Sequence, residues 1–497
     1  MIRTRIAPSP TGHAHIGLAR TALTNYLFAR KQKGSFVLRI EDTDKERSKH
    51  FYEESIIQSL KWLALSWDEG PDIGGQYGPY RQSERGHIYA DYLRKLSDQG
   101  RLYKCYCTKE DLEHEKQEQA LAKMPPRYSG KCRKLSDAKR SEYERSGKEY
   151  TLRFLLEPQT IIVKDLIRGA VTFDTALMDD FIIAKDFDAP LYNFAVVIDD
   201  ALMEITHVFR GEEHISNTPK QIQLSQALRL PTPEFGHIPL ILDSNRKKMS
   251  KREHKTAVDE YRQDGYLPEA LINFIALLGW NPGGDRELYT LAELESIFDL
   301  SHVNKSGSIF DLQKLDWFNG HYIRHADISH ITQLAIPQFI TVGYILESDT
   351  GEYTSKTGLK ITLQLLKQIV EIERTRIKKI SEIATNAAFY FEDQLNYDTA
   401  LLQWKQMTME DLRDSLRFAK ECLVSLSEHE WTNASIESSL KERIQAAGKQ
   451  NGYILWPLRV SLSGLKASPS PFEIATIIGK ARVLQRIECA LSKLTQS

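Results

Sequence analysis

The sequence predicts an α/β fold of the doubly wound type with an inserted domain, followed by an all-helical region. Three observations predict it. Strand and amphipathic helix patterns alternate over residues 1–105 and again over residues 191–245, as in the two halves of a doubly wound sheet. Residues 106–190 change to closely spaced strand patterns, which indicates an inserted α+β domain with its own sheet. Residues 246–325 are mostly helical, and residues 326–497 show helical spacing without strand patterns, so we expect an all-α region of two subdomains there.

Length and composition limit the protein class. At 497 residues the chain is long enough for about three domains of ~150 residues each. The net charge is −1, so any nucleic-acid site must be a local basic patch. No stretch approaches the ~20 apolar residues that span a membrane, and the first strand begins almost at once, so we expect no signal peptide and a cytoplasmic location. The five cysteines, an odd number, favour a reducing compartment over a disulfide framework.

The first strand and the first helix flank a loop rich in proline and glycine. Residues 1–7 are β-capable, and Pro8 and Pro10 end the strand because proline cannot donate to a ladder. Helical spacing begins at Ile16, and a second strand pattern covers residues 35–40. Ligands of such a unit lie at carboxyl ends of strands and at helix N-termini. Five residues fall at that edge: Arg5, Ser9, His15, Gly17 and Glu41. An ordinary strand–loop–helix turn that contains a histidine has the same pattern.

The remaining elements up to residue 245 follow in order. We expect helices over residues 52–67, 87–99, 109–123, 136–150 and 216–228, a further helix beginning after Pro190, and strands over residues 101–107, 152–156, 161–163, 170–173, 181–184, 205–210 and 235–242. The strand over residues 101–107 is expected to end the first half of the doubly wound domain.

Two arginines stand at strand ends of the predicted sheet. Arg5 lies near the end of the first strand, and Arg210 is the last residue of the strand over residues 205–210. Arginine is always charged and binds carboxylates through paired hydrogen bonds, so the two suit a substrate with two carboxylates. Glu41, on the strand beside Arg5, suits an ammonium group. A lone arginine or glutamate at a strand end is more often part of a surface ion pair, so the interpretation depends on their combination.

Three cysteines lie close together in the chain, as Cys105-x-Cys107 and Cys132. Thiolates in one compact segment are ligands of tetrahedral zinc. The spacing is not that of a usual zinc finger, and three reduced structural cysteines are the alternative.

Two short stretches far apart in the chain resemble the paired signatures of one enzyme family. His15-Ile16-Gly17 resembles the HIGH signature of class I aminoacyl-tRNA synthetases, and Arg-Lys-Lys-Met-Ser-Lys-Arg at residues 246–252 resembles their KMSKS signature. The wider strings RIAPSPTG, HIGLAR, FVLRIEDTD and GPYRQSER look like glutamyl-tRNA synthetase. The resemblance implies a Rossmann-like catalytic domain, an insert that grips the acceptor end of tRNA, and a C-terminal anticodon-binding region.

The same resemblance implies a function and its residues. It implies a monomeric glutamate–tRNA ligase that activates L-glutamate with ATP and Mg²⁺ and transfers it to tRNA(Glu). ATP would contact His15, Gly17, Lys248, Met249, Ser250, Lys251 and Arg252, with His15, Lys248 and Lys251 as the catalytic residues. Glutamate would contact Arg5, Ser9, Glu41, Tyr192 and Arg210.

The resemblance also bears on the cysteines. Many members hold zinc in this segment, with a histidine two residues after the third cysteine or a tyrosine before it. Here the later position is Lys134, which cannot ligate a metal while protonated. The implied zinc ligands are therefore Cys105, Cys107, Cys132 and Tyr128, and the fourth ligand is in doubt.

An anticodon-reading arginine is expected by the same resemblance. Arg376 is the best match, on a helix expected over residues 374–388, and Arg374 is two residues away. Arginine has donors only, whereas the pairing edge of cytosine offers acceptors and that of guanine offers mainly donors. We therefore expect a preference for tRNA(Glu) over tRNA(Gln). A solvated helix face with basic residues is the alternative.

Three other functions compete with this interpretation. A HIGH-fold nucleotidyltransferase that acts without tRNA would not need the long helical C-terminal half. A glutaminyl-tRNA synthetase would carry a C-terminal β-barrel region where helices are expected here. An inactive tRNA-binding paralogue would have lost His15 or the lysines, and both are present.

Overall fold

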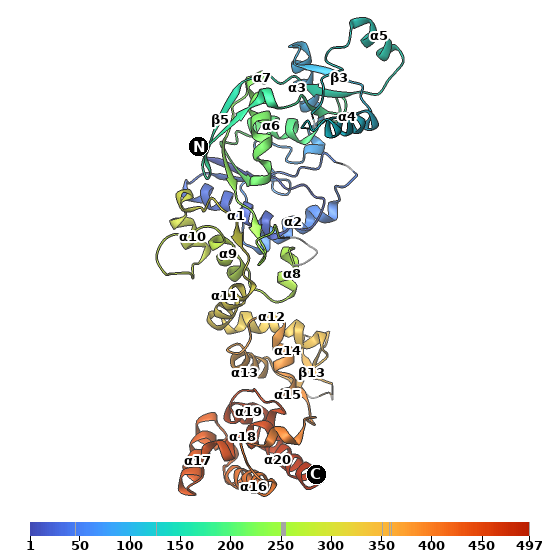
Figure 1. The fold of residues 1–497 in the computed structure, drawn as a ribbon. Helices are drawn as coiled ribbons and strands as arrows, with labels where there is room; N and C mark the ends of the chain where they lie inside the picture. Colours follow the sequence, from blue (N-terminus) through green and yellow to red (C-terminus); the bar gives the residue numbers. More distant parts are fainter. Residues whose placement is uncertain are drawn as a thin grey trace. The chain divides into compact units, whose positions relative to one another are not determined.

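The computed structural model describes residues 1–44, 46–125, 127–249, 255–349, 351–356, 358 and 360–496. The chain forms two compact units, one of Met1–Arg262 with Pro268–Leu315 and one of Gln263–Leu267 with Asp316–Ser497 (Figure 1). Among the described helices, none combines the length and apolarity that a membrane crossing requires. The finer division into domains stays a prediction.

The first unit contains the parallel strands that the alternating patterns predicted. β1 (Arg3–Ile6) pairs with β2 (Ser35–Leu38), and β8 (His207–Gly211) pairs with β9 (Glu234–Ile238). The Thr206 N–H donates to the Arg3 carbonyl at 3.0 Å, so β8 follows on beside β1. The carboxyl ends of these strands therefore lie at one edge, where ligands of doubly wound sheets bind.

Helices cover the strands and supply the apolar core. α1 (Ile16–Lys31) packs against β1, β2 and β8, while α3 (Gly86–Asp98), α6 (Tyr192–Leu202) and α7 (Thr218–Leu228) pack on one another. The core between the last three contains Tyr89, Leu93, Phe194 and Leu224. α2 (His50–Trp62) ends before the predicted residue 67, because Ala64 adopts a left-handed φ of 56°.

The insert has its own antiparallel sheet, as predicted, but the sheet begins earlier. Its strands are β3 (Leu102–Cys105), β4 (Thr151–Phe154) and β7 (Phe181–Ala184), in the order β3-β4-β7. β3 therefore opens the sheet of the insert rather than ending the first half of the doubly wound domain. Its hydrogen-bond partner is β4, about fifty residues away, which the local pattern did not reveal.

Two further helices and a hairpin complete the insert. They are α4 (Lys109–Leu121), α5 (Asp137–Arg145), and the antiparallel pair β5 (Thr160–Asp165) and β6 (Gly169–Asp174). β5 alternates exposed and buried residues, so Ile161, Val163 and Asp165 face inward. Ile161 and Val163 pack with Val208 and Phe235 of the parallel strands, and the hairpin thereby covers β8 and β9.

The rest of the first unit follows the last parallel strand. It contains β10 (Ile241–Leu242), which pairs with β11 (Ser308–Ile309), and the helices α8 (Val258–Gln263), α9 (Pro268–Leu277) and α10 (Leu291–Ile297).

The second unit is helical apart from one small sheet. Its helices, with α11 starting in the first unit, are α11 (Leu312–His325), α12 (Ile328–Thr341), α13 (Leu363–Glu373), α14 (Glu382–Asn386), α15 (Ala388–Phe391), α16 (Met409–Val424), α17 (Asn433–Ala446), α18 (Asn451–Ser463), α19 (Pro471–Ile478) and α20 (Lys480–Gln496).

Two expectations for this unit are wrong in detail. An antiparallel sheet of β12 (Ile345–Glu347), β13 (Tyr353–Ser355) and β14 (Lys360–Ile361) interrupts the region expected to be all-α, with Gly343 and Gly351 at left-handed φ at its turns. The helix expected over residues 374–388 is broken, because the Ile380 N–H and the Ser381 hydroxyl donate to the carbonyls of Gly265 and Asp264 instead of continuing a helix.

Candidate active site

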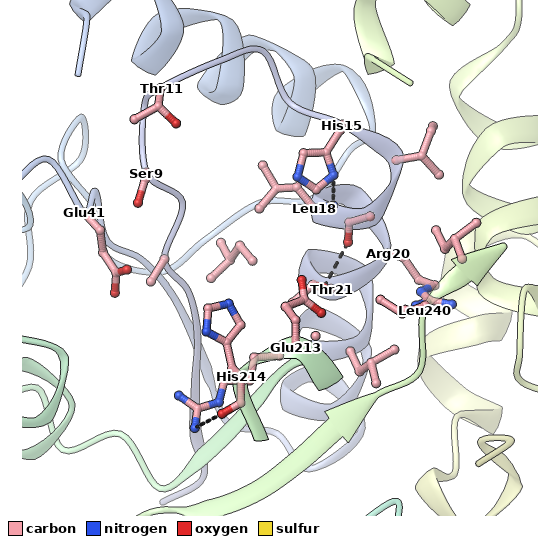
Figure 2. A pocket seen from close by; sticks show the side chains of 18 of the residues that line it. Ser9, Thr11, His15, Leu18, Arg20, Thr21, Glu41, Glu213, His214 and Leu240 are labelled. Carbon is pink, nitrogen blue, oxygen red and sulfur yellow. Dashed lines mark hydrogen bonds between the residues drawn. The ribbon is translucent and has the colours of Figure 1, made fainter. Parts of the chain in front are cut away.

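A cavity of about 700 Å³ lies at the carboxyl ends of the parallel strands and the N-terminus of α1. Nine residues singled out from the sequence line it together: Arg5, Ser9, His15, Gly17, Glu41, Tyr192, Arg210, Lys248 and Met249. Figure 2 shows Ser9, His15, Glu41 and His214 around this space. Ser250, Lys251 and Arg252 lie outside the described residues. The structure thus places the predicted residues in one site, and their individual roles stay predictions.

His15 is the N-cap of α1, which defines its tautomer. Its Nδ1 accepts a hydrogen bond from the Leu18 N–H at 3.0 Å (Figure 2), so a neutral ring carries its proton on Nε2. Gly17 leaves room for this ring, since a Cβ there would lie 3.0 Å from Nδ1 and 3.1 Å from Cε1 and would push the imidazole aside. The start of α1 therefore offers the Nε2–H of His15 and backbone N–H groups as hydrogen-bond donors. This arrangement suits an anionic ligand.

Arg5 is buried and paired with a carboxylate. Its Nε and Nη2 lie 3.3 and 3.4 Å from the two oxygens of Asp200, which also accepts from Arg39 Nη1 at 2.8 Å. Burial opposes the charge of Asp200, but Arg5 and Arg39 outweigh it and lower its pKa. Asp200 was not singled out in the sequence. The signal was two adjacent aspartates in the otherwise apolar run of α6, where buried charges require partners.

Arg210 is also buried, with 5% exposure, but its partners differ. Its guanidinium donates to Gln221 Oε1 at 2.8 Å, to Thr218 Oγ1 at 2.8 Å and to His237 Nε2 at 3.2 Å. Burial lowers the pKa of Arg210, and the charge of Arg5 acts in the same direction. Among the described residues, no carboxylate forms an ion pair with it. A buried cation held by neutral acceptors at the edge of a cavity is arranged to receive an anionic ligand.

Glu41, Tyr192 and His214 complete the wall of the cavity. Glu41 is 7% exposed and lies 3.3 Å from Arg39 Nη2; burial raises its pKa more than Arg39 and Arg5 lower it. The Tyr192 hydroxyl lies 3.4 Å from His214 Nδ1. Burial and the neighbouring Arg210 lower the pKa of His214 to about 4, so its ring is neutral at pH 7. The sequence pattern did not single out His214, which lies three residues after the end of β8, in the short 3₁₀ helix Glu212–Asn217.

The three cysteines of the insert come together. The Sγ atoms of Cys105, Cys107 and Cys132 all lie within 4.8 Å of one another, and Tyr128 Oη lies 3.4 Å from Cys105 Sγ. Hydrogen bonds from Cys132 and Tyr128 lower the pKa of Cys105 to about 4, whereas burial and the hydrogen bond to the Cys105 sulfur raise the pKa of Tyr128. Tetrahedral zinc with Zn–S bonds of ~2.3 Å places sulfurs roughly 3.8 Å apart, so this donor set fits the ion.

In the second unit, Arg376 lies in the turn after α13 rather than on a helix. Its Nε is 3.6 Å from Glu373, and 30% of its side chain is exposed. Arg374 is more engaged, because its guanidinium donates to the Ala326 carbonyl at 2.9 Å and to Glu371 at 2.7 Å. Of the two arginines, Arg376 is therefore the one with capacity for a further acceptor.

Comparison with known proteins identifies matches over both units. Residues 1–317 match the family model of the catalytic domain of class I tRNA synthetases (E and Q), and residues 331–491 match that of an anticodon binding domain. The glutamate–tRNA ligase of Carboxydothermus hydrogenoformans is 44% identical over 488 residues, 98% of this chain and 99% of its own. That of Desulforamulus reducens is 44% identical over 498 residues, 99% of each chain. The crystal structure of a glutamate tRNA ligase from Elizabethkingia meningosepticum, in complex with its amino acid, superposes with a TM-score of 0.87 at 30% identity and 99% coverage of both chains.

Proposed function

This chain belongs to the class I tRNA synthetases of the glutamate and glutamine group, and from this membership we propose that it is a glutamate–tRNA ligase. In the first step, the α-carboxylate of L-glutamate attacks the α-phosphorus of ATP, supplied as its magnesium complex, and pyrophosphate leaves. In the second step, a ribose hydroxyl of the terminal adenosine of tRNA(Glu) attacks the carbonyl of glutamyl-adenylate, and AMP leaves.

The charge pattern of the cavity carries this proposal. Glutamate has two carboxylates and one ammonium group, and the cavity offers the buried arginines Arg5 and Arg210 and the buried carboxylate Glu41. A third buried arginine of the lining, Arg20, already donates to the backbone carbonyls of Pro239 and Leu278. Arg210 has neutral hydrogen-bond partners, so a ligand carboxylate supplies the charge it lacks. Glutamine would place a neutral amide against one of the arginines, and a buried charge without a partner costs several kcal/mol.

The other side of the cavity suits the phosphates of ATP. The Nε2–H side of His15 and the backbone N–H groups at the start of α1 are donors for phosphate oxygens. Lys248 brings a positive charge from the segment after β10. The negative charge that builds up on the phosphates in the transition state is thus stabilised by groups already in place. By family resemblance, Ser250, Lys251 and Arg252 complete the phosphate contacts.

The test is ATP–pyrophosphate exchange with the purified chain. We expect exchange with L-glutamate and none above background with L-glutamine. By family resemblance we also expect exchange to require tRNA(Glu), because glutamyl enzymes complete their site when tRNA binds. Exchange with glutamine at the rate of glutamate would contradict the proposed substrate, and exchange without any tRNA would contradict the tRNA requirement. A nucleotidyltransferase that acts without tRNA is disfavoured by the anticodon-binding match over residues 331–491.

We further propose that the insert binds one structural zinc ion through Cys105, Cys107 and Cys132, with Tyr128 as the fourth ligand. The convergence of three sulfurs and one phenol oxygen supports it. Bound zinc would hold the segment around α4 to β3 and requires thiolate ligands.

For the tRNA, we propose that Arg376 reads the third anticodon base. Its position in an open turn supports this, since a loop side chain reaches a splayed base more readily than one packed along a helix. Cytosine presents acceptors to the guanidinium, and guanine presents donors.

We also propose that the protein is a monomer and acts in the cytoplasm. Light scattering coupled to size-exclusion chromatography tests the oligomeric state.

A further inference from the structure

A buried polar chain leads from the hairpin of the insert to Arg210. Asp165, the last residue of β5, faces inward, and its Oδ2 lies 2.6 Å from Nδ1 of His237 on β9. Both side chains have no exposed surface. The same carboxylate also accepts the backbone N–H groups of Ile167, Arg168 and His237 at 2.8 to 3.2 Å. Asp165 is therefore held from several sides and accepts hydrogen bonds at both oxygens.

This arrangement determines which nitrogen of His237 carries the proton. Burial would raise the pKa of Asp165, but the hydrogen bonds from His237 and from the backbone lower it, so the carboxylate is ionised and can only accept. His237 must then carry its proton on Nδ1, and burial lowers the pKa of the ring so that it stays neutral. Its Nε2 is left as a lone-pair acceptor deep inside the protein.

That acceptor faces the guanidinium of Arg210. Arg210 Nε lies 3.2 Å from His237 Nε2, and the Thr218 hydroxyl lies 3.2 Å from the same nitrogen. Nη1 donates to Gln221, and Nη2 donates to Thr218 and, at 3.5 Å, to the His214 carbonyl. Three acceptors on three edges define the plane of the guanidinium. If the imidazole proton moved to Nε2, an N–H would face the Nε–H of Arg210, and the two donors would repel.

We propose that Asp165 and His237 are positioning residues for the amino acid: Asp165 fixes the tautomer of His237, and His237 orients Arg210 toward the substrate carboxylate. This inference rests on the proposed function, because the carboxylate concerned is that of glutamate. It assigns to the β5–β6 hairpin of the insert a role in amino-acid affinity, although Asp165 lies behind Arg210 and does not line the cavity.

The first test is Asp165→Asn, which preserves volume and removes the charge. In the variant an amide NH₂ group, which can only donate, faces Nδ1 of His237. Nδ1 must then accept, so the imidazole proton moves to Nε2. We expect the KM for glutamate to rise about 10- to 100-fold, whereas the KM for ATP changes less than threefold. Asp174→Asn is the matched control, because Asp174 lies on the same hairpin and, among the described residues, its carboxylate accepts from the neighbouring Ala176 N–H; it should leave both constants unchanged.

A second variant separates positioning from packing. In His237→Gln, the amide oxygen can take the place of Nε2 and accept from Arg210 without help from Asp165. We expect a KM for glutamate within about fivefold of wild type, and adding Asp165→Asn to this variant should change it less than threefold. Non-additivity of this kind indicates that the two residues act through one chain. Equal effects of Asp165→Asn in both backgrounds would overturn the proposal.

The tautomer itself is observable by NMR. Long-range ¹H–¹⁵N spectra of ¹⁵N-histidine-labelled protein, with the His237 signals assigned by their loss in His237→Gln, should show the Nδ1–H form in wild type and the Nε2–H form in Asp165→Asn. An Nε2–H form in wild type would overturn the inference.

If wild type shows no glutamate-dependent exchange with tRNA, the proposed function fails. If wild type is active and folded Asp165→Asn keeps the wild-type KM for glutamate, only the positioning inference fails.

Discussion

Replacing Arg210 by glutamine should separate binding from stability. In wild type the guanidinium has no carboxylate partner among the described residues and donates to His237, Gln221 and Thr218. Under the proposed function, the carboxylate of bound glutamate would be its main counter-charge. Losing one partner of a buried charge pair costs roughly 3–5 kcal/mol. At 1.4 kcal/mol per tenfold, Arg210→Gln should weaken glutamate binding by about 10²- to 4 × 10³-fold.

The free energy of unfolding should change little in the same variant. Removing the guanidinium loses four hydrogen bonds of about 1–2 kcal/mol each, but it also removes the several kcal/mol that burying a cation costs. These opposing effects are of similar size, so we expect a change of less than about 2 kcal/mol and a Tm within a few degrees of wild type.

The assay is isothermal titration of glutamate in the presence of tRNA(Glu) and a non-hydrolysable ATP analogue, next to chemical unfolding without ligands. Arg210→Lys is the companion variant, since it keeps the charge and loses the planar fork, and it should recover only part of the affinity. Unchanged glutamate affinity in Arg210→Gln would refute the assignment of Arg210. A loss of more than about 4 kcal/mol of stability would refute the reasoning that this cation is not needed for folding.

Four other predictions follow from the same structure. Arg5→Ala should weaken glutamate binding at least tenfold and also lower the free energy of unfolding by roughly 1–3 kcal/mol, because Asp200 keeps only Arg39; equal stability to wild type in urea would contradict it. Burial raises the pKa of Glu373 to about 7 from an ordinary 4.5, so the protein loses stability as the pH rises between these two values. Glu373→Gln should therefore be more stable than wild type by about 3 kcal/mol at pH 8 and by under about 1 kcal/mol at pH 5. Urea unfolding of both proteins at the two pH values tests this, and an equal difference at both would contradict it. Arg376→Gln should lower the ratio of kcat/KM on tRNA(Glu) to that on tRNA(Gln) by about tenfold, and a ratio equal to wild type assigns the role elsewhere. Metal analysis of protein purified without chelator should find close to one zinc per chain and close to none in Cys132→Ser; stoichiometry near zero in wild type would leave the cysteines as reduced thiols.

The sequence by itself was enough for the elements that local chemistry defines. These elements are β1, α1 and β2. Their signals are local in the chain: prolines at positions 8 and 10, helical spacing from Ile16, and an apolar run over residues 35–38. The rule that ligands bind at carboxyl ends of parallel strands predicts one site for Arg5, His15 and Glu41, and these three residues line one cavity in the structure.

Other features required knowledge of the long-range contacts. β3 belongs to the insert because it pairs with a strand about fifty residues later, and the turn that carries Arg376 exists because Ile380 and Ser381 bond to residues 264 and 265. No local pattern contains such information, since strand pairing and competing hydrogen-bond acceptors depend on which segments meet in space.

The same reason explains what the sequence could and could not say about the site. Residue type reveals that arginine binds carboxylates, so Arg5 and Arg210 could be named from the sequence alone. The sequence could not show whether each arginine already has a carboxylate partner within the protein. Asp200 is 195 residues from Arg5 in the chain, and His237 is 72 residues from Asp165. Only the tertiary structure decided that Arg5 is paired within the protein and that Arg210 is held by neutral groups. Buried charges are satisfied by whatever the fold brings within about 3 Å, and that is a property of the packed chain rather than of any segment in it.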